Sequence, residues 1–513
     1  MLSVRGLRIL SAAFFCALAL IGAATFRDYG LPYDEGVMDS LGHDAYRYVQ
    51  GEAPWPDNPQ WRYHGTFVEL PLYALQEALG LRDDPPQFNN RKVYVRHAVS
   101  FAFYLLAVFA VYLVAMLHTR HRGWSLLAAL VFVLLPRIYA HGFYNSRDVP
   151  QIALFTLAIA ALLHLLEGPN LRRSIMLGVC IASALSLRMT ALILLPLTWL
   201  FLAADAWRSP SDRWSGRIVA AAVTSVAAAV LTVVFWPFLW ASPLTHFLEA
   251  YRFMSTLAQG ETFFLGSMHD GVPWYYIPVW MSVTIPPIFL AFALFGTARA
   301  IVVPITERRA CSASSRTELL FAAWLLLPIA AVVATGAGLY LEWRHVFFIA
   351  PAVALLAMTG LRSAVCSPRM RKSVWAVVMS GAVAAQCAST AAWMVRHHPH
   401  QHLYYSIPMH VAVGTFLGDY WALSYKQSAG ALLALRRHER ITAYSDENNA
   451  FYNLYTFYPE AIGTVLRAVD INDAMYVLTR SPELAKSLRA LHEERVDGVV
   501  ISGVYAGPRY PAD

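Results

Sequence analysis

Residues 7–36 read LRILSAAFFCALALIGAATFRDYGLPYDEG. The part from 7 to 25 is long enough to cross a bilayer, because a membrane-spanning helix needs about 20 apolar residues. The part that follows ends in two adjacent carboxylates, Asp34 and Glu35. The chain therefore places an acidic pair at a membrane surface, where ionisable groups usually serve chemistry or ion movement.

The composition is that of an integral membrane protein. Of the 513 residues, 57% are hydrophobic and 14% are charged, and the mean hydropathy is +0.44. Soluble domains are roughly 45–50% apolar and about 25% charged. The apolar stretches predict about eleven membrane spans. These are Leu7–Thr25, Ala98–Leu117, Trp124–Ala140, Val149–Leu166, Ile175–Leu187, Met189–Ala204, Ile218–Trp240, Tyr275–Ala298, Leu319–Gly336, Val346–Leu361 and Val374–Val395.

Basic residues collect in alternate gaps between these stretches, among them Arg120, Arg172, Arg213, Arg308 and Arg371. Positive charge in short loops marks the cytoplasmic side, so we expect the N-terminus inside and the C-terminus outside. The same loops account for a pI near 9.1, and no nucleic-acid partner is expected. A cleaved signal peptide is the alternative for the first stretch. It would free the acidic pair from its anchor and spoil the regular alternation.

The long outer segments and the C-terminal part differ from the spans. Segments 26–95 and 241–273 contain helical apolar patterns at 66–80 and 245–258, which indicate helices lying along the membrane surface. After Val395 a helix-like run alternates with short β-like runs at 441–445, 474–479 and 498–505. We therefore predict a polytopic α-helical membrane domain, 1–395, followed by an extracytoplasmic α/β domain, 396–513, of about 115 residues.

With this topology, charged and polar residues from distant gaps reach one face of the membrane. Ionisable residues at membrane depth cost about 2.5–3.5 kcal/mol each on insertion scales, so they are usually paired or functional. We expect the set to converge on a shared cavity at the outer face. Besides Asp34 and Glu35, the set contains Asn145, Arg147, Asp148, Arg188, His269, Asp270, Glu342, Arg344 and His345.

Such a set suits transfer of a sugar from a lipid phosphate. An acceptor hydroxyl that attacks an anomeric carbon needs one carboxylate base. The departing phosphate needs positive charge rather than a proton, and arginine supplies it with a bidentate fork. Hydrolytic glycosidases need two carboxylates, because they must also protonate a poor leaving group.

Nearly the whole chain resembles the GT-C glycosyltransferases, in particular the branch of protein O-mannosyltransferases and aminoarabinose transferases. Each matching motif is weak alone, but their order and topology together are fairly specific. The motifs are YDEG at 33–36, PRIYAHGFYNSRDVP at 136–150, LRMT at 187–190, PWYYIPVWMSVTIPP at 273–287, LEWRHVFFIAP at 341–351, HHPHQHLYYS at 397–406 and GDYWALSY at 418–425.

The resemblance implies that Asp34 is the base, that Asp148 holds the acceptor, a metal or the phosphate, and that Arg344 binds the carrier phosphate. We add Glu35 to the catalytic candidates. The remaining candidates for substrate or phosphate binding are Arg147, Arg188, His345, His269 and Tyr275. No cofactor is assigned, and a divalent cation is left open. The chain departs from the family at Ser406, where relatives often have Asn, and at Arg147, where Lys or Glu is common.

The expected protein is thus a multi-pass glycosyltransferase of the inner (plasma) membrane. Its partners are a polyprenyl-phosphate-linked sugar donor, a glycan, lipid or protein acceptor, and membrane lipids, with the active site facing the periplasm or exterior. A transporter or lipid flippase is one alternative, but such proteins place charges near the bilayer midplane, often in repeated halves. Neither feature is evident in this sequence. The other alternative, a polysaccharide polymerase or ligase of different fold, should lack the early acidic pair.

Each candidate also has a purely structural explanation. Asp34 lies two residues from both Pro32 and Gly36 and suits a turn or helix end, and Asp148 suits the N-cap of the following span. Arginines at a membrane surface can extend toward lipid headgroups without binding a substrate. The functional interpretation therefore depends on whether these groups meet around a cavity.

Overall fold

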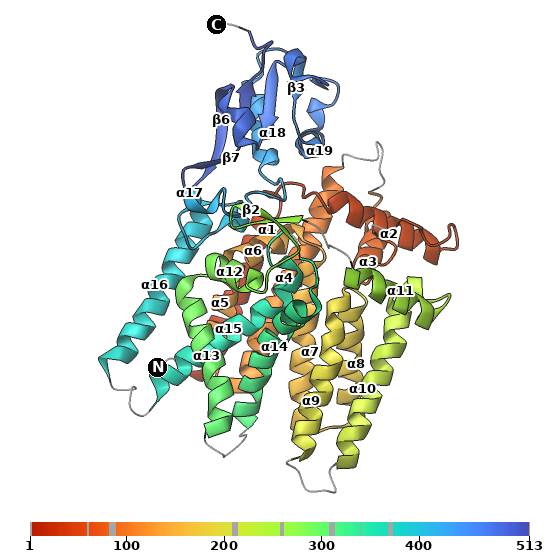
Figure 1. Ribbon diagram of the computed structural model, residues 1–513, viewed down its shortest axis with the longest axis vertical. Coiled ribbons are helices and arrows are strands. Elements are labelled where there is room, and N and C mark those ends of the chain that lie inside the picture. The colour runs from red at the N-terminus through yellow and green to blue at the C-terminus, as the bar shows by residue number, and fades with distance from the viewer. Residues whose placement is uncertain are drawn as a thin grey trace.

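The computed structural model of the chain describes residues 3–58, 61–81, 89–207, 214–256, 261–306, 313–339, 341–367 and 373–511. A bundle of long helices forms the body, and a small domain that contains the C-terminus stands on one end of it (Figure 1). The N-terminus lies toward the other end. We call the end that meets the small domain the domain end. The predicted architecture, a polytopic helical membrane domain with a C-terminal α/β domain, is confirmed.

Within the described residues, nine helices are long and apolar enough to cross a membrane. A bent pair, α5 (Arg122–Val133) and α6 (Pro136–Tyr144), makes a tenth if it counts as one span. Helix α8 (Leu171–Leu185) corresponds to the short fifth stretch of the sequence. The nine are α1 (Val4–Thr25), α4 (Asn90–Thr119), α7 (Asp148–Glu167), η1 (Met189–Ile193) with α9 (Leu194–Trp207), α10 (Trp214–Phe235), α13 (Pro287–Thr306), α14 (Ala313–Thr335), η4 (Arg344–Ile349) with α15 (Ala350–Cys366), and α16 (Val374–Arg396).

Proline breaks two segments that we expected to be continuous. The segment 124–140 bends by 73° between α5 and α6, where Pro136 is the first helical residue. The segment 275–298 is divided into α12 (Tyr276–Thr284) and α13 at Ile285 and Pro286. Proline lacks an N–H group and disfavours helical geometry in the residue before it. Both stretches were predicted as single spans, and the structure bends the first and divides the second. After the first break, α6 carries Arg137, which binds Glu342 two residues before Arg344.

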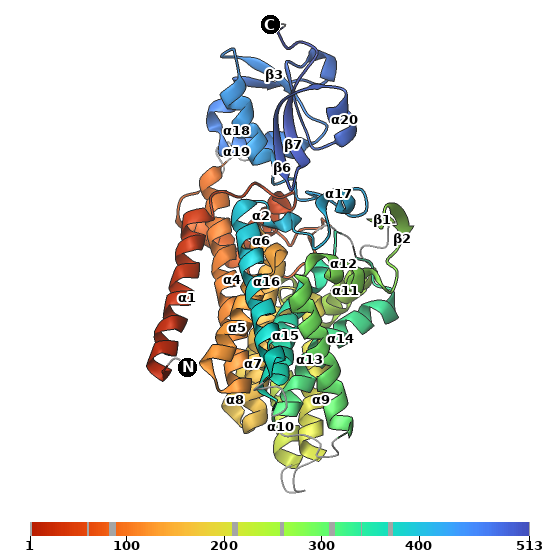
Figure 2. The ribbon, with the colours of Figure 1, turned by 90° about the vertical axis from the view of Figure 1, so that its left-hand side faces the viewer.

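Short helices lie across the domain end of the body (Figures 1 and 2). Two of them, α3 (Glu69–Ala78) and α11 (Pro243–Thr256), correspond to the helical patterns read at 66–80 and 245–258. Helix α3 lies within the first pattern, and α11 begins two residues before the second, of which 257–258 lie outside the described residues. The helix α2 (Glu35–Val49) was not predicted. It starts immediately after Asp34, so the acidic pair marks the beginning of a helix.

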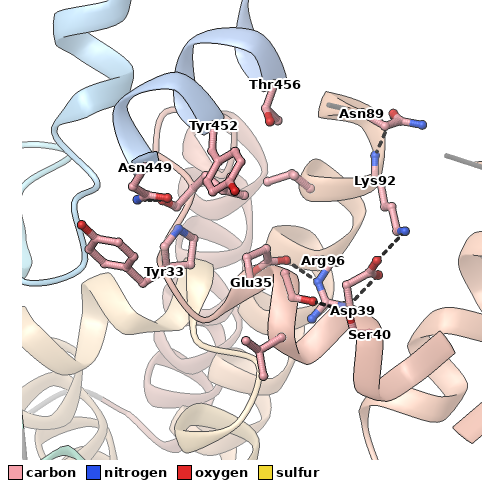
Figure 3. A pocket seen from close by; sticks show the side chains of 15 residues that line it. Tyr33, Glu35, Asp39, Ser40, Asn89, Lys92, Arg96, Asn449, Tyr452 and Thr456 are labelled. Carbon is pink, nitrogen blue, oxygen red and sulfur yellow. Dashed lines mark hydrogen bonds and ion pairs between the residues drawn. The ribbon is translucent and has the colours of Figure 1, made fainter. Parts of the chain in front are cut away.

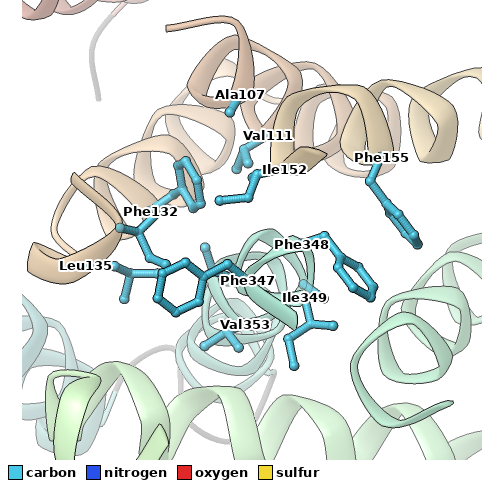
Figure 4. Close-up of a cluster of buried hydrophobic side chains, with 14 of the residues drawn as sticks. Ala107, Val111, Phe132, Leu135, Ile152, Phe155, Phe347, Phe348, Ile349 and Val353 are labelled. Atoms are coloured by element: carbon cyan, nitrogen blue, oxygen red, sulfur yellow. The ribbon is translucent and has the colours of Figure 1, made fainter. Parts of the chain in front are cut away.

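A large apolar core fills the body between α4, α5, α7 and α15, as Figure 4 shows. Aromatic rings pack closely there: the Phe155 and Phe348 rings stack with centroids 4.6 Å apart. Small residues let helices approach each other, since a Cβ on Gly296 of α13 would lie 2.2 Å from the carbonyl oxygen of Leu356 on α15. This packing fixes the segment 344–349, which carries Arg344 at its start.

The C-terminal domain contains a five-stranded sheet in the order β4-β3-β5-β7-β6. Strands β3 (Ile441–Tyr444), β4 (Val465–Arg467) and β5 (Tyr476–Thr479) are parallel, whereas β6 (Arg489–Val496) and β7 (Val499–Ala506) join by antiparallel pairing. The sequence indicated β3, β5 and β7 but not β4 or β6. The helices are α18 (Tyr425–Leu435), α19 (Asn448–Phe457) and α20 (Pro482–Lys486), with the short α17 (Met409–Ala412) before them.

Candidate active site

A cavity of about 510 Å³ opens at the domain end of the body, and we call it the arginine cavity. Its polar lining includes Asp34, Arg147, Arg188, Arg344 and His345. These residues come from the start of α2, the N-terminus of α7, the N-terminus of η1 and the segment η4. The structure thus brings together five of the nine site candidates, from four separate stretches of sequence. Apolar side chains line the rest, among them Met38, Leu187, Met189, Trp236, Val332, Leu339 and Val346.

Local structure positions two carboxylates at the site: Asp34, which lines the cavity, and Asp148, which pairs with Arg188 and Arg344. Asp34 is the N-cap residue of α2, yet its carboxylate makes no capping hydrogen bond, so the oxygens are available to the cavity. Asp148 opens α7, where Asn145 does the capping: its Oδ1 accepts from the backbone N–H of Asp148 at 2.8 Å. The simple capping explanation therefore accounts for neither carboxylate.

Arg344 follows a tight turn with an uncommon backbone conformation. Leu341 and Glu342 both have positive φ, 56° and 63°, which few residues other than glycine adopt. Buried Glu342 is held on both carboxylate oxygens, because Arg137 donates to it at 2.7 Å and the Tyr420 hydroxyl donates at 2.6 Å. These bonds stabilise the turn that directs Arg344 into the cavity.

Arg344 lies between the two carboxylates. Its Nη1 is 3.5 Å from Oδ2 of Asp34 and 3.6 Å from Oδ2 of Asp148. Asp148 is buried and also pairs with Arg188 and accepts from Asn145 Nδ2 at 2.7 Å. The Asp34 side chain, in contrast, is 46% exposed. The carboxylate of Asp148 is therefore bound by protein side chains, whereas the carboxylate of Asp34 is partly accessible from the cavity.

Two further contacts hold the arginines. The guanidinium of Arg147 donates to the carbonyl oxygen of Leu187 at 3.2 Å. The guanidinium of Arg344 lies over the indole ring of Trp421, 4.9 Å from its centroid. Trp421 belongs to the segment leading into the C-terminal domain, and sequence reasoning did not assign it to the site. Trp421 lies in the motif at 418–425 that resembles the GT-C family, and that motif was the available signal.

Glu35 points away from the arginine cavity. It pairs with buried Arg96, which also binds Glu69 at 2.8 Å. Burial raises the pKa of Glu35 to about 7, although Arg96 acts in the opposite direction. The side chains of Asp34 and Glu35 are adjacent in sequence but therefore lie in different environments. Arg96 was missed in the sequence, where its position just before an apolar stretch was the available signal.

The remaining two candidates lie elsewhere. His269 is on β2 (Ser267–Asp270), which pairs with β1 (Glu261–Phe264), and its Nε2 contacts the carbonyl oxygen of Phe264 at 3.0 Å. Tyr275 packs against the rings of Phe264 and Trp274. The structure does not bring either side chain to the arginine cavity.

The donor set does not fit a metal ion. Within the part of the chain that the structure describes, no three His, Cys, Asp or Glu side chains gather in a possible ligand group. The carboxylates of Asp34 and Asp148 instead face the guanidinium groups of Arg344 and Arg188. Arginine already supplies the positive charge that a cation would bring.

Comparisons with known proteins rest on structure alone. No protein-family model matches the sequence, and neither does any curated protein. The archaeal oligosaccharyltransferase AglB from Archaeoglobus fulgidus, solved with an inhibitory peptide and a dolichol-phosphate, is similar with a TM-score of 0.52 at 10% identity, over 98% of this chain and 75% of that one. ArnT from Cupriavidus metallidurans, bound to undecaprenyl phosphate, is similar with a TM-score of 0.50 at 14% identity, over 98% of both chains. The chain therefore has the GT-C-like membrane fold that its sequence led us to expect.

Proposed function

We propose that the protein is a membrane glycosyltransferase that moves a sugar from a polyprenyl-phosphate donor to an acceptor hydroxyl. The acceptor O–H gives its proton to the carboxylate of Asp34, and its oxygen bonds to the anomeric carbon of the sugar. The bond from that carbon to the phosphate oxygen breaks, and the electron pair leaves with the polyprenyl phosphate. No external acid is needed, because phosphate is a good leaving group once its charge is stabilised.

The position of Arg344 between Asp34 and Asp148 is the observation that carries this proposal. One arginine then lies within reach of both the base and the leaving group. Asp34 suits the base because it is half-exposed and lines the cavity. Asp148 suits a positioning role, since its oxygens are occupied by Arg188, Arg344 and Asn145.

The charge of the arginine cavity favours a phosphate ligand. Arg147, Arg188 and Arg344 outnumber the carboxylates of Asp34 and Asp148, so the lining is cationic. Arginine forks bind phosphate oxygens bidentately and shorten the hydrogen bonds through charge. The apolar part of the lining suits the first isoprene units of a lipid. The lipids named for AglB and ArnT, dolichol-phosphate and undecaprenyl phosphate, are ligands of this chemical kind.

The proposed location is the inner (plasma) membrane, with the arginine cavity on the periplasmic or exterior side. The arginine pattern of the loops supports this orientation, because the residues that line the cavity come from segments on the side away from the basic loops. The lipid donor then reaches the cavity from the outer leaflet. A glycan, a lipid or a protein supplies the acceptor hydroxyl.

An Asp34→Asn variant tests the assignment of the base. Purified full-length protein would be given polyprenyl-phosphate sugars extracted from native membranes, with envelope material from a deletion strain as acceptor. We expect Asp34→Asn to bind undecaprenyl phosphate like the wild type but to transfer no sugar, because Asn accepts no proton. Asp473→Asn, on the exposed surface of the C-terminal domain, is the matched control. Full transfer by Asp34→Asn would exclude Asp34 as the base.

A further inference from the structure

A second cavity of about 470 Å³ lies between the membrane body and the C-terminal domain, and we call it the interdomain cavity. Its floor comes from α2 and the start of α4, and α19 covers it from the side of the C-terminal domain (Figure 3). Much of its lining is polar. The polar residues are Tyr33, Glu35, Asp39, Ser40, Asn89, Lys92, Arg96, Asn449, Tyr452 and Thr456.

One short segment separates this cavity from the arginine cavity. Asp34 lines the arginine cavity, its neighbour Glu35 lines the interdomain cavity, and Val37 lines both. A gap of about 20 Å³ lies beside the segment and touches Asp34, Glu35, Arg344 and other residues of both cavities. Such a volume has room for about one water molecule or hydroxyl group. A group held in the interdomain cavity therefore has a short path to the carboxylate of Asp34.

The two cavities differ in their charge. In the interdomain cavity, Lys92 pairs with Asp39 at 2.6 Å, and Arg96 pairs with Glu35 and Glu69. The lining of this cavity thus contains two carboxylates, Glu35 and Asp39, and two cations, Lys92 and Arg96, and both cations are engaged by the protein. A phosphate group entering here would meet no excess positive charge, whereas it would meet excess positive charge in the arginine cavity.

The polar groups of the interdomain cavity suit hydroxyl groups. Carboxylates accept hydrogen bonds from hydroxyls, and the Thr456 hydroxyl offers a donor and an acceptor. The side-chain oxygens of Asn449 and Ser40 offer further acceptors, since the Asn449 amide N–H and the Ser40 hydroxyl already donate to backbone carbonyls. The Tyr452 side chain reaches from α19 over the cavity and is 43% exposed, so an aromatic surface stands beside the polar one. A few placed polar groups beside an aromatic wall are typical of small-molecule sites.

We propose that the interdomain cavity binds the acceptor, and that this acceptor is an uncharged, hydroxyl-rich glycan. The proposal rests on the function proposed above for Asp34 and the arginine cavity. The reacting hydroxyl reaches Asp34 through the small gap, and the lipid-linked donor occupies the arginine cavity on the other side of the segment 32–38. The two substrates thus approach the base from opposite sides, and the charge of each cavity selects its own substrate.

Gly36→Trp is a direct test, because it fills the interdomain cavity without altering Asp34 or the arginines. Gly36 is exposed, and a Cβ added there meets no atom within 4 Å. Gly216→Trp on α10 is the matched control, since its surroundings are equally open. Full-length protein in detergent micelles would be applied to an array of uncharged, phosphorylated and sulfated oligosaccharides. Undecaprenyl phosphate binding and thermal unfolding would be measured on the same samples.

We expect wild type and Gly216→Trp to bind uncharged glycans, and Gly36→Trp to bind them at least about tenfold more weakly. All three should bind undecaprenyl phosphate equally. We expect Tyr452→Ala also to bind uncharged glycans more weakly than the wild type, and this variant replaces Gly36→Trp in the test if Gly36→Trp does not fold.

Three results would overturn the acceptor site: unchanged glycan affinity in both cavity variants, preference for phosphorylated glycans, or no glycan binding by the wild type. Failure of the wild type to bind undecaprenyl phosphate is a separate result. It would overturn the proposed donor and therefore the function itself.

Discussion

The side-chain amide of Asn453 forms two hydrogen bonds with the backbone of Leu31. The N–H of Leu31 donates to Asn453 Oδ1 at 2.8 Å, and Asn453 Nδ2 donates to the carbonyl oxygen of Leu31 at 3.2 Å. Asn449 adds a third bond to the same carbonyl at 3.0 Å. Both asparagines are buried on α19. The C-terminal domain therefore holds the chain three residues before Asp34 and contributes to the position of the proposed base.

Loss of the Asn453 amide should impair catalysis more than donor binding. Asn453→Ala removes the partner of the Leu31 N–H, whereas the Leu31 carbonyl keeps its bond from Asn449. An unsatisfied buried polar group costs about 1–3 kcal/mol. We expect a lower thermal unfolding temperature and a lower kcat, because Asp34 is less well placed, with unchanged affinity for undecaprenyl phosphate. Asn472→Ala, at an exposed turn of the same domain, is the control. A kcat equal to that of the wild type would leave Asn453 with a structural role only.

Gly30→Ala should destabilise the contact between the same segment and the C-terminal domain. An added Cβ would lie 2.2 Å from the carbonyl oxygen of Leu423 and 2.9 Å from Asn453 Oδ1, so backbone must move. Overpacking of this kind costs about 1–3 kcal/mol. Gly418→Ala is a suitable comparison, because a Cβ there meets nothing within 4 Å. Equal unfolding temperatures for the two variants would show that the backbone around Gly30 accommodates the added methyl group at little cost.

Replacement of Trp421 should weaken binding of the lipid phosphate. Its indole ring supports the Arg344 guanidinium, and a cation–π contact contributes about 0.5–2 kcal/mol. We expect Trp421→Leu to raise the Kd for undecaprenyl phosphate by about two- to thirtyfold. Trp421→Phe keeps an aromatic face and should recover most of the affinity, whereas exposed Trp375→Leu should have no effect. Equal Kd values for the Leu and Phe variants would rule out the ring contact as the cause.

Glu35 should make stability depend on pH. Burial raises the pKa of Glu35 from 4.5 to about 7, so the folded protein holds this proton at pH values where the unfolded chain has released it. Stability from this group is therefore greatest below pH 4.5 and falls as pH rises toward 7. We expect the unfolding temperature of Glu35→Gln to change less between pH 5 and 7 than that of the wild type. Parallel pH profiles of wild type and variant would contradict the raised pKa.

Much of the architecture was predictable because its signals are local. Runs of apolar residues and the arginine bias of the gaps are read one segment at a time, so the spans, the C-terminal domain and the convergence of Asp34, Asp148, Arg188 and Arg344 could be anticipated. The breaks at Pro136 and Pro286 also have a local cause, but they were missed because the spans were assigned from apolar content alone. The helix α2 was missed because turn residues, Pro32 and Gly36, surround its start.

The sequence by itself determined that this is a polytopic membrane protein with acids and arginines gathered at one face, because hydrophobicity and charge decide membrane insertion along the chain. Only the tertiary structure decided that Asp34 and Glu35 face different cavities, and that Trp421 and Asn453 support the site from the C-terminal domain. Consecutive residues at a helix start point in different directions, and contacts across hundreds of residues form only when the chain is packed. Neither effect leaves a pattern in the order of the residues.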